Sequence, residues 1–541
     1  MNRVRGRLAL LSMLALAALA VTASSGAAAN PARTPILGVV PHAGGVAAAA
    51  HGLLSRAAVG TATPTTLTFD SSYETLINRY FADVAAASGT TSNVYSVATQ
   101  YSGSNGPVLN QSTVGGAYVD KDPLPANGCD DLVDTYCLTD SQLQQEIQAV
   151  MTAKGWQGGL DHIFFLMTPQ GVGSCVDASP DFCTTNTFCA YHSAFGTISN
   201  PVIYANQPYE GHVNGCAIGL GFPNDVDSDT TINLISHEHN ESITDPLGDG
   251  WIAADGNENG DLCLLVFGAG LGTVSGQAYN QVIDGHKYDL QEEWSNADAK
   301  AGNGCVPTLG GATSPPSPFC SPCSGPLLYG GGPVMHTNTT HAIYWLPTAG
   351  NTSPPAVTGT PLVGQTLTTT QGTWNDAPTG FPVQWQRCSA AGTNCANISG
   401  ATATTYKLTT ADEGDTVRAS VTATNVNGAS QPAASNLTAV VVGPPVATTP
   451  PQISGKTKVG KSLTASKGTW SGPPQTYRLQ WLRCNGGGSS CKAIGKATKT
   501  AYKLTKKDAK HRLRVRVTAS NAAGTKAALS RATAKVPTAK K

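Results

Sequence analysis

The residues best suited to chemistry lie in one short stretch, 235–246. His237 and Glu241 are four positions apart, so on a helix they lie on one face, one turn apart. Zinc peptidases with an HExxH motif use this geometry to place two ligands on one metal, with the intervening glutamate as general base. Here a carboxylate takes the second ligand position, and carboxylates also bind zinc. The stretch therefore predicts a metal site with His237 and Glu241 as ligands and Glu238 as general base.

A third ligand must come from elsewhere in the chain, and the acidic loop 255–263 is the best source. Glu258 is the first candidate and Asp261 the second. Such a site predicts that a water activated by the metal attacks a peptide bond, with Glu238 returning the proton to the leaving amine. Zn²⁺ is the expected cofactor. A set rich in carboxylates also suits Ca²⁺ or manganese, and the loop partly resembles an oxygen-rich calcium loop without the spacing of an EF-hand.

The same residues allow an interpretation without chemistry. HExxE is a short pattern that chance often supplies in a chain of this size. Acidic residues on an exposed helix face are usually solvated, and His237 could simply cap or pack. A non-catalytic protein with a structural or vestigial metal site therefore stays open beside the hydrolase.

The elements around these residues predict an α/β (α+β) domain. Apolar residues recur at helical spacing from Tyr73 to Val84, and Thr139-x-x-Gln142 resembles a capping box that opens a second helix. The candidate ligands lie on a third helix, about 229–244, which Asp245-Pro246 ends. Helices that alternate with strands indicate a sheet with helices packed on it. Strands are expected at 93–101, 162–167 and 202–205.

The C-terminal part of the sequence is a repeat. Nine positions between Gly364 and Asn425 recur 96 positions later, between Gly460 and Asn521, without a gap. Short alternating strands between Gly and Pro turns indicate small β-sandwiches with a core tryptophan. The pattern GTW…QWxRC…C…Y.LT resembles the immunoglobulin-like repeats of secreted actinobacterial proteins over 352–537. This resemblance implies two immunoglobulin-like domains, at 351–443 and 447–537.

A second resemblance covers residues 70–310. It lies in the order of four blocks: Phe182 to His192, Asn233 to Pro246, Gly250-Trp251, and Glu258-x-x-Asp261-x-Cys263. These blocks resemble the Exordium or phosphate-induced protein family and its bacterial relatives. Those are secreted proteins whose fold is similar to zinc metallopeptidases and whose catalytic activity is not generally established. The resemblance implies a zincin-like domain at 66–310 with a metal at His237, Glu241 and Glu258.

One block stands out of order. Members of that family typically begin with a block like Tyr329–Trp345, which here follows the metal-site region. A circular permutation is favoured, in which residues 340–346, within a linker at 311–350, return to the sheet beside 162–167. The alternative is a truncated second copy that is disordered or paired at an edge.

Several features predict export. Residues 1–29 have the layout of a signal peptide, and their apolar run is too short to span a bilayer comfortably, although an uncleaved anchor is the alternative. Residues 30–65 have little periodicity and are interpreted as a flexible leader or propeptide. The 14 cysteines, several closely spaced, indicate disulfides; a zinc knuckle at Cys320-x-x-Cys323 lacks further ligands. We expect a secreted or cell-wall-associated protein with no transmembrane segment in the mature chain.

The charge is unevenly distributed although the formal net charge is zero. From Gly443 onward the chain holds 21 of the 34 Lys and Arg residues but only one acid, so this segment carries about +20. Arg512, Arg514 and Arg516 alternate with apolar residues and are predicted to lie on one exposed face. They predict attachment to an anionic cell-wall or extracellular polymer, with a merely solubilising surface as the alternative. Interleaved aromatic residues are absent there, so specific nucleic-acid binding is not expected.

These observations lead to one hypothesis and one rival. The hypothesis is a secreted metallopeptidase-like protein that cleaves a peptide substrate and is attached through a cationic immunoglobulin-like domain to an anionic extracellular surface. The rival is a non-catalytic extracellular adhesion or signalling protein with a structural or vestigial metal site.

Overall fold

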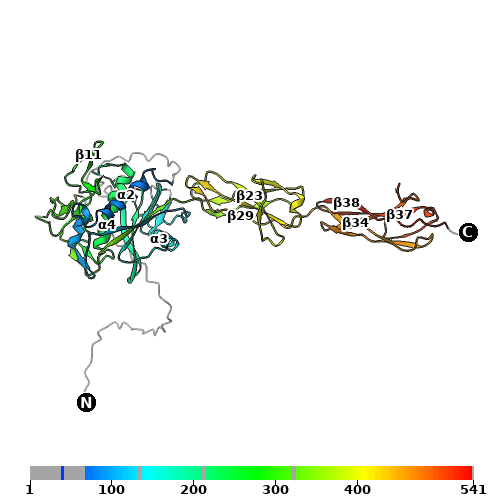
Figure 1. Ribbon diagram of the computed structural model, residues 1–541, viewed down its shortest axis with the longest axis horizontal. Helices are drawn as coiled ribbons and strands as arrows, with labels where there is room; N and C mark the ends of the chain where they lie inside the picture. Colours follow the sequence, from blue (N-terminus) through cyan, green and yellow to red (C-terminus); the bar gives the residue numbers. More distant parts are fainter. Residues whose placement is uncertain are drawn as a thin grey trace, which may run out of the picture.

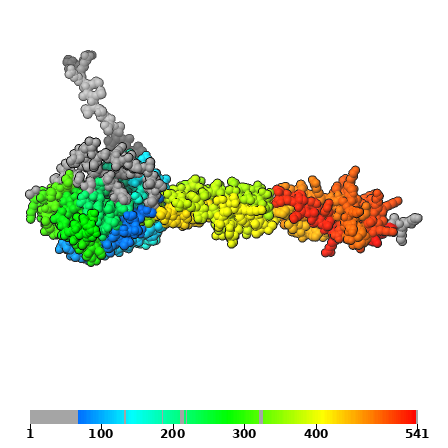
Figure 2. Space-filling model, turned by 90° about the horizontal axis from the view of Figure 1, so that it is seen from above, coloured from blue at the N-terminus to red at the C-terminus, as the bar shows by residue number. Residues whose placement is uncertain are grey.

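The computed structural model describes residues 38–41, 67–131, 134, 136–184, 186–209, 215–217, 219–300, 302–318 and 325–538. The expected signal peptide at 1–29 and the Cys320-x-x-Cys323 pair lie outside these residues. The described chain forms an N-terminal α/β domain followed by two β-sandwiches in a row (Figures 1 and 2). Among the helices of the described chain, none has the length and apolar character needed to cross a membrane.

A six-stranded mixed sheet organises the N-terminal domain, in the order β1-β8-β9-β6-β18-β4. The four strands from β9 to β4 run parallel, β8 is antiparallel to β9, and the edge strand β1 is antiparallel to β8. Its strands are β1 (Gly38–Pro41), β4 (Ser112–Asp120), β6 (His162–Met167), β8 (Phe188–Thr197), β9 (Asn200–Gln207) and β18 (Asn338–Trp345).

Strand β18 comes from far along the chain and lies between β6 and β4. Its residues from Thr339 to Tyr344 pair in parallel with His162–Met167, which is the position that the sequence predicts for 340–346. Six of its eight residues form the unbroken buried run Thr340–Trp345. Such a run is typical of a parallel strand covered on both faces. The N-terminal sheet is therefore complete only when the chain reaches Trp345.

Helices cover both faces of this sheet. Helices α2 (Tyr73–Ala86) and α4 (Val226–Thr244) contribute to the core on one face, and α3 (Asp140–Lys154) packs on the other. Helix α3 begins with the predicted capping box of Thr139 and Gln142. Helix α4 begins three residues earlier than predicted. Its N-cap is Asp225, whose carboxylate accepts a hydrogen bond of 2.7 Å from the backbone N–H of Ser228.

Two local predictions differ from the structure. Residues 93–101 are predicted as a strand, but Val94–Gln100 forms a 3₁₀ helix, η1. Five successive residues of η1 are buried, so burial does not alternate as it would along a strand with one exposed face. The Ser96 hydroxyl donates a hydrogen bond of 2.8 Å to the Asn93 carbonyl. The leader is predicted to be flexible, yet Gly38–Pro41 forms β1 against β8. The rest of the leader lies outside the described residues.

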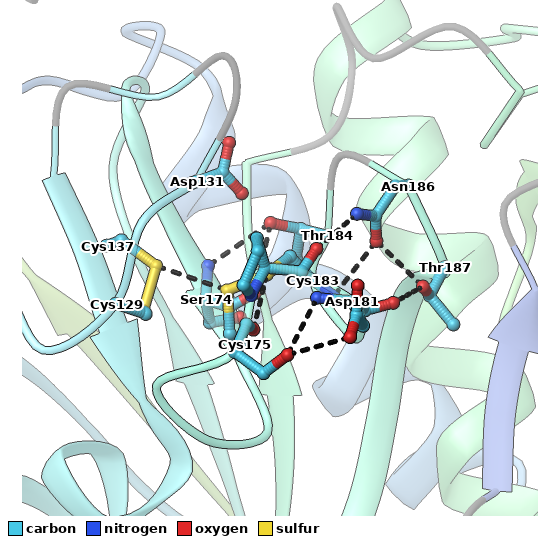
Figure 3. The surroundings of a disulfide bond; sticks show 12 residues. Cys129, Asp131, Cys137, Ser174, Cys175, Asp181, Cys183, Thr184, Asn186 and Thr187 are labelled. Carbon is cyan, nitrogen blue, oxygen red and sulfur yellow. Dashed lines mark hydrogen bonds between the residues drawn. A yellow bond between two sulfur atoms is a disulfide. The ribbon is translucent and has the colours of Figure 1, made fainter.

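Disulfides link segments that are mostly close in sequence. Cys129–Cys137 and Cys175–Cys183 are neighbours, with the sulfurs of Cys137 and Cys175 3.3 Å apart (Figure 3). Parallel pairing of β5 (Tyr136–Thr139) with β7 (Val172–Cys175) brings the two disulfides together. Every described cysteine is paired, which indicates an oxidising, extracellular environment. The other four bonds are Cys189–Cys216, Cys263–Cys305, Cys388–Cys395 and Cys484–Cys491.

Short hairpins and turns complete the N-terminal domain. They are β2 (Ser102–Gly103), β3 (Gly106–Pro107), β5 (Tyr136–Thr139), β7 (Val172–Cys175), β10 (Trp251–Ile252), η2 (Asp261–Cys263), β11 (Gly272–Val274), β12 (Gln277–Tyr279), β13 (Gln281–Ile283), β14 (His286–Tyr288), β15 (Glu293–Trp294), β16 (Cys305–Val306) and β17 (Leu328–Tyr329).

The two repeats are immunoglobulin-like β-sandwiches of one design. In repeat 1 (351–443) the three-stranded sheet β20-β21-β25 and the four-stranded sheet β24-β23-β26-β29 enclose the core; in repeat 2 (447–537) the sheets are β31-β32-β36 and β35-β34-β37-β38. The predicted core tryptophans include Trp385 and Trp481, both 0% exposed. The repeated sequence thus encodes a repeated fold.

The elements of repeat 1 are β19 (Asn351–Ser353), β20 (Val357–Thr358), β21 (Thr366–Thr369), β22 (Thr373–Trp374), β23 (Val383–Cys388), β24 (Ala396–Asn397), β25 (Thr405–Lys407), η3 (Thr410–Asp412), β26 (Thr416–Val421), β27 (Thr424–Asn425), β28 (Gly428–Ala429) and β29 (Ala433–Ala434). Those of repeat 2 are β30 (Val446–Thr449), β31 (Ile453–Ser454), β32 (Ser462–Ala465), β33 (Thr469–Ser471), β34 (Thr476–Cys484), β35 (Lys492–Ala493), β36 (Ala501–Lys503), η4 (Lys506–Asp508), β37 (Arg512–Asn521) and β38 (Gly524–Leu529).

The same asparagine ties each repeat to the segment that precedes it. In repeat 1 the Asn425 side-chain amide donates to the carbonyls of Pro347 and Asp376, each at 2.9 Å. In repeat 2 the equivalent Asn521 donates to the carbonyls of Gly443 and Gly472, at 2.8 and 2.9 Å. The two joints therefore share an equivalent asparagine amide.

Candidate metal centre

Helix α4 is unusual because it is polar and yet buried along its whole length after its first residue. Every residue from Asp227 to Thr244 is buried, between the sheet strands β8 and β9 and the loops that follow the helix. Side chains at positions four apart share a face. His237 and Glu241 do so: the imidazole Nε2 lies 2.9 Å from the carboxylate Oε1, and both residues are 0% exposed. The predicted pair therefore forms, in the interior rather than on a solvated face.

The acidic loop reaches the same place. The backbone N–H of Asp261 donates to Glu241 Oε1 at 3.0 Å, and its Oδ1 lies 3.8 Å from His237 Nε2. His237, Glu241 and Asp261 thus offer three ligand atoms within 4.8 Å of one another. Glu258, the first candidate for the third ligand, instead faces His192, with Oε1 3.8 Å from that residue's Nε2. Asp261 is therefore better placed than Glu258 to complete a set with His237.

His192 is the site residue that the sequence argument missed. It lies on β8, and its Nδ1 is 3.1 Å from Glu238 Oε2 and 3.6 Å from Glu241 Oε2. Its Nε2 lies 3.3 Å from the backbone carbonyl of Asp245, which orients the ring as a protein group commonly orients a metal-binding histidine. His192, Glu238 and Glu241 form a second set of atoms within 4.8 Å. The available signal was a histidine inside an otherwise apolar strand.

His237 is held by a neighbouring amide. The Gln291 Nε2 lies 2.8 Å from His237 Nδ1 and donates to the Gly260 carbonyl at 2.8 Å. Its Oε1 accepts a hydrogen bond of 3.1 Å from the backbone N–H of Leu265, which fixes the amide plane. The ring of His237 is therefore fixed with Nε2 directed at Glu241.

Negative charge dominates the electrostatics of the centre. Burial alone would lower the histidine pKa values, but the surrounding carboxylates raise that of His237 to about 10 and that of His192 well above its usual range. Burial would raise the pKa of Glu241, yet the two histidines lower it to about 2. Burial and the charge of Glu241 raise the pKa of Glu238 to about 7. The centre therefore holds protons that a bound cation could replace.

Further buried carboxylates add to the negative charge of the centre. They are Glu258 and Asp261 from the acidic loop and Glu293 from β15. Burial raises the pKa values of Glu258, Asp261 and Glu293 well above their usual ranges, and Glu241 raises them further. Both oxygens of Glu258 and of Glu293 are buried and have no hydrogen-bond partner among the described residues. The same holds for Glu238 Oε1, Glu241 Oε2 and Asp261 Oδ1.

This donor set fits a metal ion. Buried carboxylate oxygens without partners are costly unless a cation or proton compensates them. Two imidazoles beside carboxylates favour a borderline ion such as zinc over calcium, which prefers oxygen ligands. The residues in position to hold it are His192, His237, Glu238, Glu241 and Asp261, with Glu258 close by.

Access to the centre is restricted. His192, His237, Glu238 and Glu241 are 0% exposed, and Asp261 is 5% exposed. Strand β1 of the leader contributes to this closure, since Gly38 pairs with His192 at the sheet edge and β1 also contacts α4 and η2. A substrate could not reach these side chains without movement of the chain around them.

The three arginines of repeat 2 differ in part from the prediction. They alternate with buried Leu513, Val515 and Val517 as expected, but Arg512 and Arg514 are half-buried and only Arg516 is exposed. The guanidinium of Arg512 donates to the carbonyl of Thr533 at 2.9 Å. That of Arg514 donates to the carbonyl of Ser530 at 3.3 Å. Both guanidinium groups are thus partly engaged by backbone carbonyls, so exposed lysines contribute more of the free positive surface.

Neither a protein-family model nor a curated protein matches this chain. Solved structures that match include fragments made of immunoglobulin and of fibronectin domains. The chicken CNTN1 FN1-FN3 domains match at 14% identity over 35% of this chain and 67% of their own, with a TM-score of 0.22. The titin I67-I69 fragment matches at 14% identity over 36% of this chain and 68% of its own, with a TM-score of 0.19.

The Dscam1 isoform 1.9 fragment of four immunoglobulin domains matches at 15% identity over 37% of this chain and 50% of its own, with a TM-score of 0.17. This chain thus spans half the length of that fragment. Likeness at these scores carries no argument about activity or partners. The immunoglobulin-like architecture rests on the strands and cores described above. The resemblance of residues 70–310 to the Exordium family gains no support from these matches.

Proposed function

We propose that this chain is an extracellular binding protein with a zinc centre inside its N-terminal domain and a cationic immunoglobulin-like domain at its far end. The observation that supports it most is the group of buried carboxylate oxygens without partners beside two oriented imidazoles. When bound there, zinc would supply a positive charge that compensates these carboxylates and links α4 to β8 and η2.

A structural role for the ion is favoured by burial. The side chains that would hold it are 0–5% exposed, as in a closed structural site, whereas a catalytic site keeps one position open to water and substrate. Adhesion would then belong to repeat 2. Its exposed basic residues occur on several strands and turns, and a field of one sign attracts polyanions with a strong dependence on salt. They include Lys456, Lys458, Lys461, Lys503, Lys506, Lys507, Lys510 and Arg516.

The metal proposal is tested by elemental analysis of the purified, secreted protein. We expect about one zinc per chain, lost with a chelator, and a lower unfolding temperature after its loss. The E241Q variant removes the carboxylate shared by the two sets and should lose the metal, whereas the surface variant D161N should keep it. Absence of zinc in the wild type, or full zinc content in E241Q, would contradict the proposal.

The adhesion proposal is tested with an anionic polymer on a surface. We expect the full chain to be retained and released as salt rises, and a chain that ends at residue 442 to pass through unretained. Equal retention of both chains would show that repeat 2 is not the attachment domain.

Peptide hydrolysis is the second candidate, because two observations favour it. Glu238 Oε1 has no partner among the described residues, and the pKa of this carboxyl is raised to about 7 by burial and Glu241, which suits proton transfer near neutral pH. Strand β1 occupies the edge next to His192, and an extended peptide can add to an exposed sheet edge in the same way. Under this hypothesis the domain is zincin-like, as the Exordium resemblance implies, and the leader blocks it.

This candidate is tested by removing residues 30–66 from the secreted chain and measuring cleavage of unfolded casein. Hydrolysis that appears on removal, disappears in E238Q and persists in D161N would establish a peptidase. If E238Q keeps its zinc and the wild-type chain cleaves no casein with or without residues 30–66, only the structural role of the metal remains.

A further inference from the structure

A second group of carboxylates lies away from the zinc centre, where β4 ends and α3 passes over it. Asp120 is the last residue of β4, and Asp122 follows two positions later in the segment after the strand. Glu146 reaches them from α3. Each of the three offers an oxygen within 4.8 Å of the other two.

Two oxygens of this group are buried without a hydrogen-bond partner among the described residues. Asp120 is 2% exposed; its Oδ1 accepts the backbone N–H of Asp122 at 3.1 Å, but its Oδ2 has no partner among the described residues. Glu146 Oε1 is likewise buried without a partner. A nearly buried carboxylate oxygen directed at two other carboxylates requires a proton or a cation.

Nearby basic side chains do not supply that charge. No salt bridge within the described part of the chain involves any of the three carboxylates. Lys154, at the end of α3, places its ammonium over the ring of Tyr118, 3.4 Å from the centroid. Burial, followed by Asp120 and Asp122, raises the pKa of Glu146 to about 9, so without a cation this carboxyl is protonated at neutral pH.

The site is also accessible. Asp122 is exposed and lines a cavity of about 420 Å³ between the N-terminal domain and repeat 1. The exposed carboxylate of Asp122 would therefore bind an ion from solvent, and water could fill the remaining positions around the ion. This differs from the zinc centre, where every donor is buried.

We propose that Asp120, Asp122 and Glu146 bind a calcium ion. The donors are all carboxylate oxygens, which are the ligands of a hard cation, and no imidazole or thiolate is among them. Calcium accepts six to eight oxygens in flexible geometry, so three carboxylates and water suffice. With so few protein ligands the affinity should match extracellular calcium modules, with a Kd of about 10⁻⁴–10⁻³ M.

Because of its position, a bound ion would affect the segment that joins the N-terminal domain to repeat 1. The Asp122 carbonyl accepts the Trp345 Nε1–H at 2.8 Å, and the Lys121 carbonyl accepts the backbone N–H of Thr348 at 3.1 Å. Two residues on, the backbone N–H of Leu124 donates to Asp376 Oδ2 of repeat 1 at 3.2 Å. Calcium would therefore hold the segment that joins the sheet to repeat 1.

Terbium luminescence tests the site in the full secreted chain, because Trp345 lies beside Asp122 and can transfer excitation energy to Tb³⁺. We expect sensitised emission that calcium displaces, and calcium titration by calorimetry with an affinity in the stated range. E146Q should weaken calcium binding by about tenfold or more, since it removes one of three charged ligands. The surface variant D161N should bind calcium like the wild type.

Two further variants keep the result interpretable. D122N alters an exposed ligand and should fold even if E146Q does not; it should also weaken calcium binding. E241Q, which removes the shared carboxylate of the zinc centre, should bind calcium unchanged, so failure of the zinc proposal would not affect this one. The proposal is overturned if calcium neither binds nor displaces terbium. It is also overturned if D122N and E146Q both bind calcium as the wild type does. In either case a proton shared by Asp120 and Glu146 explains the group.

Discussion

Glu241 is the residue on which the proposed zinc centre depends most. Its Oε1 lies 2.9 Å from His237 and its Oε2 3.6 Å from His192, so it connects a helix to a strand through one carboxylate. The His237–Glu241 pair could be predicted because four residues on a helix make one turn. His192 could not, because its neighbourhood exists only once β8 packs against α4. The preference for Glu258 over Asp261 as third ligand likewise could not be settled, since loop direction is a tertiary property.

Gln291 provides a test at this scale, because it contacts His237 without being a ligand. Its Nε2 lies 2.8 Å from His237 Nδ1. Q291L should lower zinc affinity by about 10- to 100-fold, as loss of such an orienting partner typically does. Competition with a zinc-binding dye measures it, and Q145L, an exposed glutamine on α3, is the control. Unchanged affinity in Q291L would mean that Nε2 of His237 does not bind the ion.

Asp412 gives a pH-dependent prediction in repeat 1. Burial alone would raise its pKa, but hydrogen bonds from Thr409 and Arg387 lower it below the ordinary 3.8. A carboxyl with a lowered folded-state pKa contributes stability above its unfolded pKa, and this contribution is lost as pH falls through the folded pKa.

The D412N variant should therefore be less stable than the wild type at pH 7, with a difference that shrinks below about pH 4. Urea unfolding followed by tryptophan fluorescence measures it. Asp508, whose pKa is lowered in the same way in repeat 2, provides the matched variant D508N. A difference that stays constant from pH 7 to pH 3 would contradict this account.

At the scale of elements, the helices were predictable and one short segment was not. Helix α3 carries its capping box and α2 its apolar stripe, so local sequence determines both. Residues 94–100 contain the β-prone Val94, Tyr95 and Val97 but form η1, because all of them are buried in the core beside α4. Tertiary packing overrides a weak strand preference there.

Strand β18 yields a prediction about where the N-terminal domain ends. It pairs with β6 on one side and β4 on the other. A secreted chain that ends after residue 337 should fail to fold, because central strands would have unpaired backbone groups. A chain that ends after residue 349 should fold cooperatively. Circular dichroism with thermal unfolding distinguishes them, and equal cooperativity of both chains would refute the role of β18.

At the scale of the whole molecule, the joints determine the extended shape (Figures 1 and 2). Repeat 1 also contacts the N-terminal domain directly, since Asn427 donates to the Leu67 carbonyl at 2.8 Å and Asn375 to the Leu124 carbonyl at 2.9 Å. The sequence predicted the repeats but not these contacts, because they involve loop residues that the repeat pattern does not distinguish.

Asn521 tests the second joint. N521A removes the amide that links the Gly443 carbonyl, before repeat 2, to the Gly472 carbonyl within it, so the angle between the repeats should vary more in solution. Small-angle X-ray scattering should then show a broader distribution of lengths with unchanged folding of each repeat. N397A, an exposed asparagine on β24, should scatter like the wild type. Identical curves for N521A and wild type would mean that the amide does not hold the joint.

Because Asn425 and Asn521 make equivalent bonds, 96 positions apart, the chemistry needed to join one β-sandwich to the next is contained within a single unit. Duplication of such a unit lengthens the molecule by a fixed step without any new interface. Gene duplication alone could thus adjust the distance between the basic repeat 2 and the N-terminal domain, without changing the residues of either.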